Sequence, residues 1–527
     1  TSSIASAMSI SPGKKRKSRK HRQKAEYMMS PAVSYCFPDN GRDFNTEDYS
    51  PIEENRFHRV TDEPLSTFSI DVDAASYSNL RRFIKNGQTP PADAVRIEEM
   101  INYFDYDYPA PPAEGNRPFE VVTEAAPCPW NPDNQLLLIG LQGKKVPTEN
   151  LPPSNLVFLI DVSGSMQPMN KLPLLKSSLR MLVNNLRDQD RVAMAVYAGA
   201  AGLVLPSTPG TDRQKILEAI DRLQSGGSTA GAAGIKLAYE VARKNFIENG
   251  NNRVLLATDG DFNVGVSSDG ELVKIIEKER ESGIFLTVLG FGTGNYKDNK
   301  MQQLADHGNG NHYYIDNINE GRKVLVREFG GTLFTIAKDV KIQIEFNPAK
   351  IQGYRLIGYE NRMLNKEDFN DDTKDAGELG SGHRVTALYE LIPAGIQTKL
   401  LGSVDDLKYQ KSKTQRSAAH SDEMLTVKLR YKQPNGHISQ KIEKPVFHNI
   451  LTEKGTSDNF RFAAAVAEFG LLLRDSKFKG KASYQQAADL ARSALGNDQH
   501  GYRRELLDMI ETMKALKGED TRLEAEK

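Results

Sequence analysis

Short, continuously apolar runs alternate with amphipathic helical stretches between about residues 156 and 334, and this pattern constrains the fold of the chain more than any other feature. Strand-length runs lie at 157–160, 192–196, 254–257, 285–289 and 312–315. Between the first two runs, apolar residues recur at three- and four-residue spacing from Leu172 to Leu186, which predicts a helix. Strands that are apolar throughout are buried on both faces, so the pattern predicts a mostly parallel sheet covered by helices on both sides.

The segments that flank this region have different patterns, and at 527 residues the chain is expected to contain several domains. Strand-like segments lie before it, within 116–150, and again after it, within 336–450. The simplest architecture that joins them is a β-sandwich into which the α/β domain, at 151–335, is inserted. A small α/β segment is predicted at 56–115 and a helical region at 451–527. The predicted class is a multidomain α/β protein with a Rossmann-like central domain.

Charge and composition exclude some classes of partner. Lys plus Arg equals Asp plus Glu at 69 each, so net charge gives no general attraction to nucleic acid, and no apolar run reaches the roughly 18 residues of a membrane span. Residues 1–55 contain the basic run Lys14 to Arg22 without interleaved aromatic residues or periodicity, which favours a disordered basic arm over a nucleic-acid site. Cys36 and Cys128 either pair, if the compartment is oxidising, or remain thiols.

Oxygen-bearing side chains follow two of the predicted strands. Asp161, Ser163 and Ser165 come directly after the first strand, at the end of a parallel sheet where ligand sites lie. Thr229, before a predicted helix, and Asp259, after the strand at 254–257, can reach the same crevice. Together these five residues offer two carboxylates and three hydroxyls.

Oxygen donors without sulfur or imidazole select Mg²⁺, Mn²⁺ or Ca²⁺ over zinc or copper, and Mg²⁺ is the favoured ion. Two carboxylates only balance the charge of a divalent ion, while neutral hydroxyls fill further positions. The ion is therefore expected to stay electrophilic toward a carboxylate from outside.

The same residues resemble the metal-ion-dependent adhesion site of von Willebrand factor type A domains, which has an Asp-x-Ser-x-Ser motif followed by a distant Thr and a distant Asp. The resemblance implies direct contacts of Ser163, Ser165 and Thr229 with the ion, and binding by Asp161 and Asp259 directly or through water. Segments 57–79 and 459–469 extend it to a bacterial subgroup with a distinctive N-terminal segment and a C-terminal domain, often labelled calcium-activated chloride channel homologues. That subgroup implies a cell-envelope location, periplasmic or at the surface, often with a lipid-anchored precursor.

The leading functional hypothesis is a non-enzymatic, metal-dependent adhesion or scaffold module. No catalytic or organic cofactor-binding residue is predicted. The expected partner is a protein that presents Asp or Glu, with an AAA-type ATPase or an envelope protein as candidates, and no specific nucleic acid is expected.

The alternative from another class is a phosphohydrolase. Asp71 and Asp73 follow a short apolar strand at 67–70, an arrangement that resembles the nucleophile and acid of haloacid-dehalogenase-type phosphatases. The Thr or Val expected two positions after the second Asp is Ala75, and no lysine motif accompanies the pair. A helix cap at Asp73 is the simpler interpretation.

Overall fold

The computed structural model describes residues 47–112, 117–227, 231–260, 269–294, 296–328, 334–374, 376–402, 415–434 and 436–518. Most of the predicted basic arm, Cys36 and Thr229 lie outside these residues, so the predictions made for them stay predictions. Among the described residues, no helix combines the length and the apolar composition needed to cross a bilayer.

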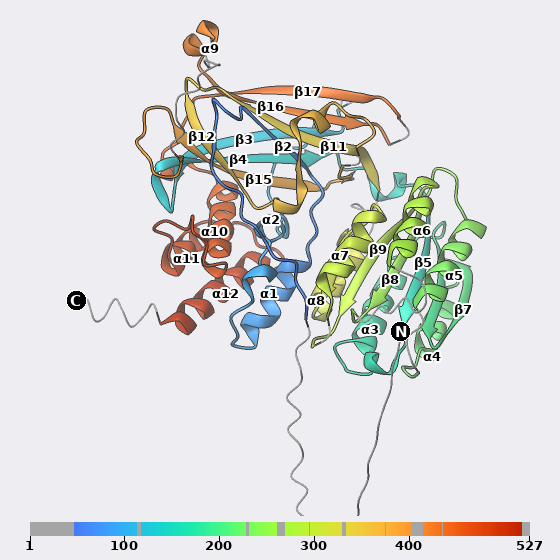
Figure 1. Cartoon of the computed structure of the whole chain (residues 1–527). Helices are drawn as coiled ribbons and strands as arrows, with labels where there is room; N and C mark the ends of the chain where they lie inside the picture. The colour runs from blue at the N-terminus through green and yellow to red at the C-terminus, as the bar shows by residue number, and fades with distance from the viewer. Residues whose placement is uncertain are drawn as a thin grey trace, which may run out of the picture. The chain divides into compact units, whose positions relative to one another are not determined.

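The central domain contains one six-stranded sheet with the order β10-β9-β8-β5-β6-β7. Strands β9, β8, β5 and β7 of this sheet are labelled in Figure 1. Its strands are β5 (Ser154–Asp161), β6 (Arg191–Ala198), β7 (Ala200–Pro209), β8 (Asn251–Thr258), β9 (Ile284–Phe291) and β10 (His312–Ile315). Neighbouring strands run parallel except β7, which is antiparallel to β6. The predicted parallel sheet is therefore confirmed, with one antiparallel strand at its edge.

Helices cover both faces of this sheet. Side chains along a strand alternate between the two faces, so neighbouring residues of one strand pack against different helices. Phe158 of β5 packs with α3 and α4, whereas Val157 and Leu159 pack with α5, α6 and α7. The helices are α3 (Leu172–Asn184), α4 (Arg213–Arg222), α5 (Gly231–Lys244), α6 (Asp269–Glu281), α7 (Asp298–His307) and α8 (Ile318–Arg322). Each central strand contributes side chains to an apolar cluster on both faces of the sheet, so it has to be apolar throughout, as the sequence shows.

Two antiparallel sheets pack together as a β-sandwich. The first has the order β1-β12-β15-β4-β3 and the second β13-β2-β11-β16-β17, with β14 also paired to β11. The strands are β1 (His58–Arg59), β2 (Leu65–Ser69), β3 (Phe119–Cys128), β4 (Asn131–Gly143), β11 (Thr335–Phe346), β12 (Ile351–Ile357), β13 (Met363–Leu364), β14 (Leu379–Gly380), β15 (Arg384–Pro393), β16 (Glu423–Lys432) and β17 (Ser439–Phe447). The central domain lies in the chain between β4 and β11, which confirms the predicted insertion. Strands β1 and β2 of the predicted N-terminal segment belong to the sandwich.

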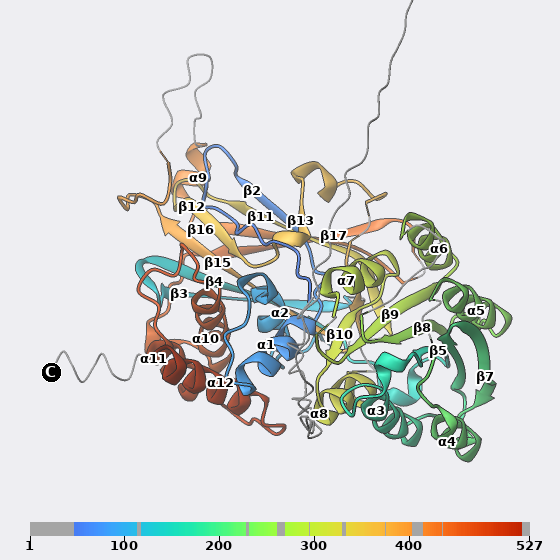
Figure 2. The same cartoon turned by 60° about the horizontal axis from the view of Figure 1, so that its bottom comes forward.

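A helical layer covers the other face of the first sheet (Figure 2). Along β4, Leu137 and Ile139 face the sandwich core, while Leu136 and Leu138 join a second core with the helices. This layer consists of α1 (Ala75–Lys85), α2 (Ile97–Asn102), α10 (Asp458–Leu473), α11 (Tyr484–Ser493) and α12 (Tyr502–Lys517). A short helix, α9 (Arg416–His420), precedes β16, and a π-helical segment at Lys323–Glu328 continues α8. Single 3-10 turns lie at Ala92–Ala94, Thr148–Asn150, Gly164–Met166, Glu360–Arg362, Lys366–Phe369 and Glu453–Gly455.

A buried arginine connects the helical layer to the central domain. The side chain of Arg81, in α1, is 2% exposed and forms ion pairs with Asp316, with Glu320 at 2.8 Å and with Glu505 at 3.0 Å. Its guanidinium also donates to the hydroxyl of Tyr103 at 3.1 Å. Because the acids come from the central domain and from α12, Arg81 holds three parts of the chain at one point.

We expect Arg81→Met to lower the free energy of unfolding by about 3–5 kcal/mol, because it leaves buried carboxylates without a counter-charge. The measurement is urea unfolding followed by the fluorescence of Trp130, the single tryptophan, which is buried in the helical layer. The matched control is Arg180→Met, whose ion pair with Asp221 is about half exposed and should contribute less than about 1 kcal/mol. Equal, small effects of the two variants would contradict this view of Arg81.

Candidate metal site

The two predicted acidic ligands lie at the ends of neighbouring strands. Asp161 is the last residue of β5, and Asp259 directly follows β8, which pairs in parallel with β5. Both residues are fully buried. Because parallel strands end at the same edge of a sheet, the fold brings both carboxylates to one crevice.

The serine hydroxyls predicted as ligands meet beside Asp161. The backbone N–H of Ser163 donates to Oδ1 of Asp161 at 2.8 Å, which shapes the loop after β5. The Oγ atoms of Ser163 and Ser165 are 2.9 Å apart. Ser163 is buried and Ser165 exposed, so the pair leads from the buried carboxylate to solvent.

The carboxylate of Asp161 is held in place from two further strands. Its Oδ2 accepts hydrogen bonds from the hydroxyl of Tyr197 in β6 at 3.1 Å and from Thr258 in β8 at 3.4 Å. Burial raises the pKa of Asp161 above its ordinary value and the negative charge of Asp259 raises it further, while the hydrogen bonds from Ser163 lower it. The crevice therefore favours an added positive charge.

A residue that the sequence analysis did not identify also enters the crevice. Nζ of Lys171 donates to Oδ2 of Asp259 at 2.8 Å, and the Lys171 side chain is only 8% exposed. Lys171 comes ten positions after Asp161 and immediately before α3. Nothing in the spacing of the motif places a lysine at Asp259, so only the structure identifies this ion pair.

The third segment of the predicted site is described only in part. Thr229 lies outside the described residues, but the loop leading toward it is anchored at the crevice. The N–H of Gly226 donates to the carbonyl of Val162 at 2.7 Å, and the N–H of Gly164 donates to the carbonyl of Gly227 at 3.2 Å. These bonds hold the loop against the turn that carries Ser163.

The donors that the structure describes fit a hard divalent ion. Asp161, Ser163, Ser165 and Asp259 present oxygen atoms only, of which two groups are carboxylates and two are hydroxyls. Mg²⁺, Mn²⁺ and Ca²⁺ prefer such ligands. The paired hydroxyls and the buried, raised-pKa carboxylate are both features that a cation would stabilise.

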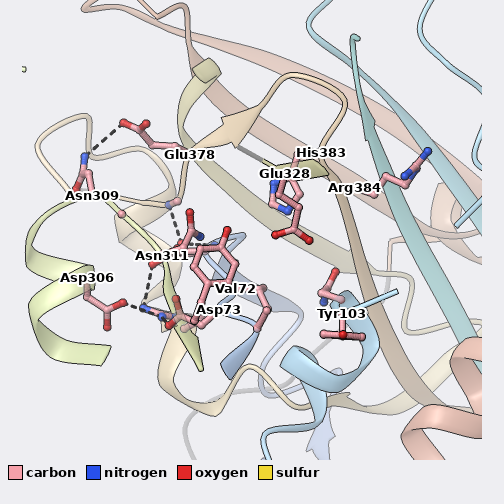
Figure 3. Close-up of a pocket in the computed structure, with 18 of the residues that line it drawn as sticks. Val72, Asp73, Tyr103, Asp306, Asn309, Asn311, Glu328, Glu378, His383 and Arg384 are labelled. Atoms are coloured by element: carbon pink, nitrogen blue, oxygen red, sulfur yellow. Dashed lines mark hydrogen bonds and ion pairs between the residues drawn. The ribbon is translucent and has the colours of Figure 1, made fainter. Parts of the chain in front are cut away.

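The alternative pair, Asp71 and Asp73, lies in a different place. Both line a cavity of about 330 Å³ bordered by the N-terminal segment, the central domain and the sandwich (Figure 3). Arg362 forms ion pairs with Asp71 at 3.1 Å, with Asp73 at 3.2 Å and with Asp306 at 2.9 Å. One guanidinium thus compensates three carboxylates from two segments, the loop after β2 and helix α7.

The contacts of Asp73 indicate a structural role. Its side chain is fully buried, and Oδ1 accepts a hydrogen bond from the backbone N–H of His312 at 2.7 Å. The prediction that Asp73 caps a helix is wrong, because α1 starts at Ala75 with Ala74 as its N-cap and without a side-chain cap bond. Asp73 instead reaches across to β10 and Arg362, which joins the N-terminal segment to the central domain and the sandwich.

Comparison with known proteins gives consecutive family matches along the chain. The von Willebrand factor model matches residues 43–138, the von Willebrand factor type A domain model 155–324, and the model described as uncharacterized protein YfbK, C-terminal, 331–516. The resemblance proposed from the adhesion-site motif and the flanking segments is thereby confirmed.

Individual relatives agree with these matches. The uncharacterized protein YfbK of Escherichia coli K12 is 45% identical over 471 residues, which is 88% of this chain and 81% of the relative. Inter-alpha-trypsin inhibitor heavy chain H3 of Bos taurus is 25% identical over 173 residues, or 31% of this chain and 19% of that protein. Among solved structures, a von Willebrand factor type A protein from Catenulispora acidiphila covers 86% of this chain and 91% of its own, with 14% identity and a TM-score of 0.38.

We expect Gly260→Ala to destabilise the central domain by about 1–3 kcal/mol, because an alanine would be strained there. Gly260 follows Asp259 with a φ of +97°, and a Cβ atom would lie 2.7 Å from the backbone nitrogen of Lys297. The measurement is thermal unfolding. Gly202→Ala in β7 is the control, since nothing lies within 4 Å of its added Cβ atom, and a similar loss in both variants would refute the close approach at Gly260.

Proposed function

Because the chain belongs to the YfbK family of von Willebrand factor type A proteins, we propose that it is a binding protein that captures a partner's carboxylate through a divalent cation. Type A domains are known for metal-dependent protein interactions.

One observation carries the proposal: two buried carboxylates and two paired hydroxyls meet at the strand ends, and the hydroxyl pair leads to solvent. Asp161, Ser163, Ser165 and Asp259 would hold the ion, with Thr229 as a further proposed ligand. Mg²⁺ is the favoured ion, ahead of Mn²⁺ and Ca²⁺. The bound ion supplies an electrophilic position for an external carboxylate.

The contacts of the same residues support binding rather than turnover. The hydroxyl of Ser163 lies 2.9 Å from that of Ser165 and also hydrogen-bonds to the carboxylate of Asp161, a proposed ligand of the ion. Asp161 receives hydrogen bonds from Ser163 and Tyr197, and Asp259 forms an ion pair with Lys171. A nucleophilic serine needs a neighbouring base such as histidine that is oriented toward it, and among the described residues the contacts of Ser163 and Ser165 include no histidine.

One carboxylate on one ion gives little specificity, so surface around the crevice should share the interface. Stable complexes bury on the order of 1,200–2,000 Å² in total. A protein with an exposed Asp or Glu fits this requirement, and an AAA-type ATPase or an envelope protein remains a proposed partner. The cell-envelope location likewise remains a proposal.

We expect Asp161→Asn to weaken Mn²⁺ or Mg²⁺ binding by at least about tenfold, because it removes one of the two negative charges at the ion. Titration calorimetry with Mg²⁺ and electron paramagnetic resonance with Mn²⁺ measure this affinity. Asp221→Asn is the control, since that exposed carboxylate pairs with Arg180 on the surface of the same domain. Equal ion binding by wild type and Asp161→Asn would refute the proposed site.

A further inference from the structure

Lys171 occupies a slot that is built for its side chain. A Cβ atom placed on Gly292 would lie 2.1 Å from Cε of Lys171 and 2.8 Å from Cγ and Cδ. Gly292 also has a φ of +79°, which disfavours any other residue. The lysine therefore passes directly over Gly292, where any side chain on that residue would compete with it for the same space.

The loop that forms this slot is held from two sides. The hydroxyl of Tyr314 donates to the carbonyl of Gly292 at 2.6 Å, and Oε1 of Glu47 accepts the N–H of Gly294 at 2.9 Å. Glu47 is itself fixed by an ion pair with Arg82 at 2.8 Å. These contacts hold the loop at Gly292 in place. The Lys171 side chain packs against this fixed loop, and its Nζ reaches Asp259.

We propose that Lys171 is a built-in competitor of the divalent ion for the carboxylate of Asp259. This inference rests on the proposed function. Without an ion, the ammonium compensates a carboxylate that is fully buried. An incoming ion has to share Asp259 with this charge or displace it, which lowers the affinity of the site for the ion.

The same lysine changes the charge that a partner meets. Asp161 and Asp259 contribute two negative charges and Lys171 one positive charge, so the three residues sum to −1. With a divalent ion bound, these three residues and the ion would sum to +1, whereas without Lys171 the two carboxylates and the ion would sum to zero. Lys171 thus lowers the affinity of the site for the ion, but it increases the attraction of the ion-loaded site for an acidic group.

The test is Mn²⁺ affinity of the full chain, measured by electron paramagnetic resonance. We expect Lys171→Met to bind Mn²⁺ at least about tenfold more tightly than wild type, because a positive charge next to the ion is removed. Lys176→Met is the control and should bind like wild type, since Nζ of Lys176 contacts the carbonyls of Asp221 and Leu223 at 3.0 Å. Unchanged or weaker binding by Lys171→Met would overturn the inference.

A second measurement covers the case in which Lys171→Met is unstable without an ion. Loss of the ammonium removes the ion pair of the buried Asp259 carboxylate, so the melting temperature of the ion-free variant should fall and Mn²⁺ should restore it. The rise on adding Mn²⁺ should be larger for Lys171→Met than for wild type, and an equal or smaller rise contradicts the competition. Lys171→Arg, which keeps the charge, should retain the wild-type affinity, and a gain equal to that of Lys171→Met would contradict a charge effect.

The two proposals fail differently. If wild type binds Mn²⁺, Asp161→Asn does not and Lys171→Met binds like wild type, the metal site stands and only the role of Lys171 is wrong. If neither wild type nor Lys171→Met binds Mn²⁺, the proposed function fails and this inference fails with it.

Discussion

Two carboxylates buried at the ends of neighbouring parallel strands need positive charge around them, and the crevice is arranged to meet that need. Asp161 is held by hydrogen bonds from Ser163 and Tyr197, and Asp259 by the ammonium of Lys171. The pairing of β5 with β8 creates the requirement, because it places both acids at one edge of the sheet. The turn at Gly260 and the slot at Gly292 then follow from the close packing of the neighbouring loops.

The sequence predicted those parts of the fold that depend on local periodicity. The apolar strands and the helix after Ser165 could be placed because alternation and three- to four-residue spacing depend only on nearby residues. Asp161 and Asp259 could be paired because the ends of parallel strands share an edge. The insertion between β4 and β11 also followed, since strand patterns appear on both sides of the central domain.

The remaining features depend on contacts between distant segments, which no local pattern encodes. Lys171 reaches Asp259 only because the loop at Gly292 leaves a slot for it. Asp73 was expected to cap a helix, but its oxygens contact His312 and Arg362, which come from other parts of the chain. Likewise, β2 joins the sandwich through its pairing with β11, some 270 positions later in the sequence.

The position of the central domain in the chain has a mechanical consequence. Its first strand follows β4 and its last helical turn precedes β11, so both ends of the domain connect to the same sandwich. A tensile load applied to a partner at the crevice would be divided between two covalent connections instead of acting on one linker. The buried ion pairs of Arg81 and Arg362 would carry part of that load, so the domain should resist being pulled away from the sandwich more strongly than a domain tethered at one end.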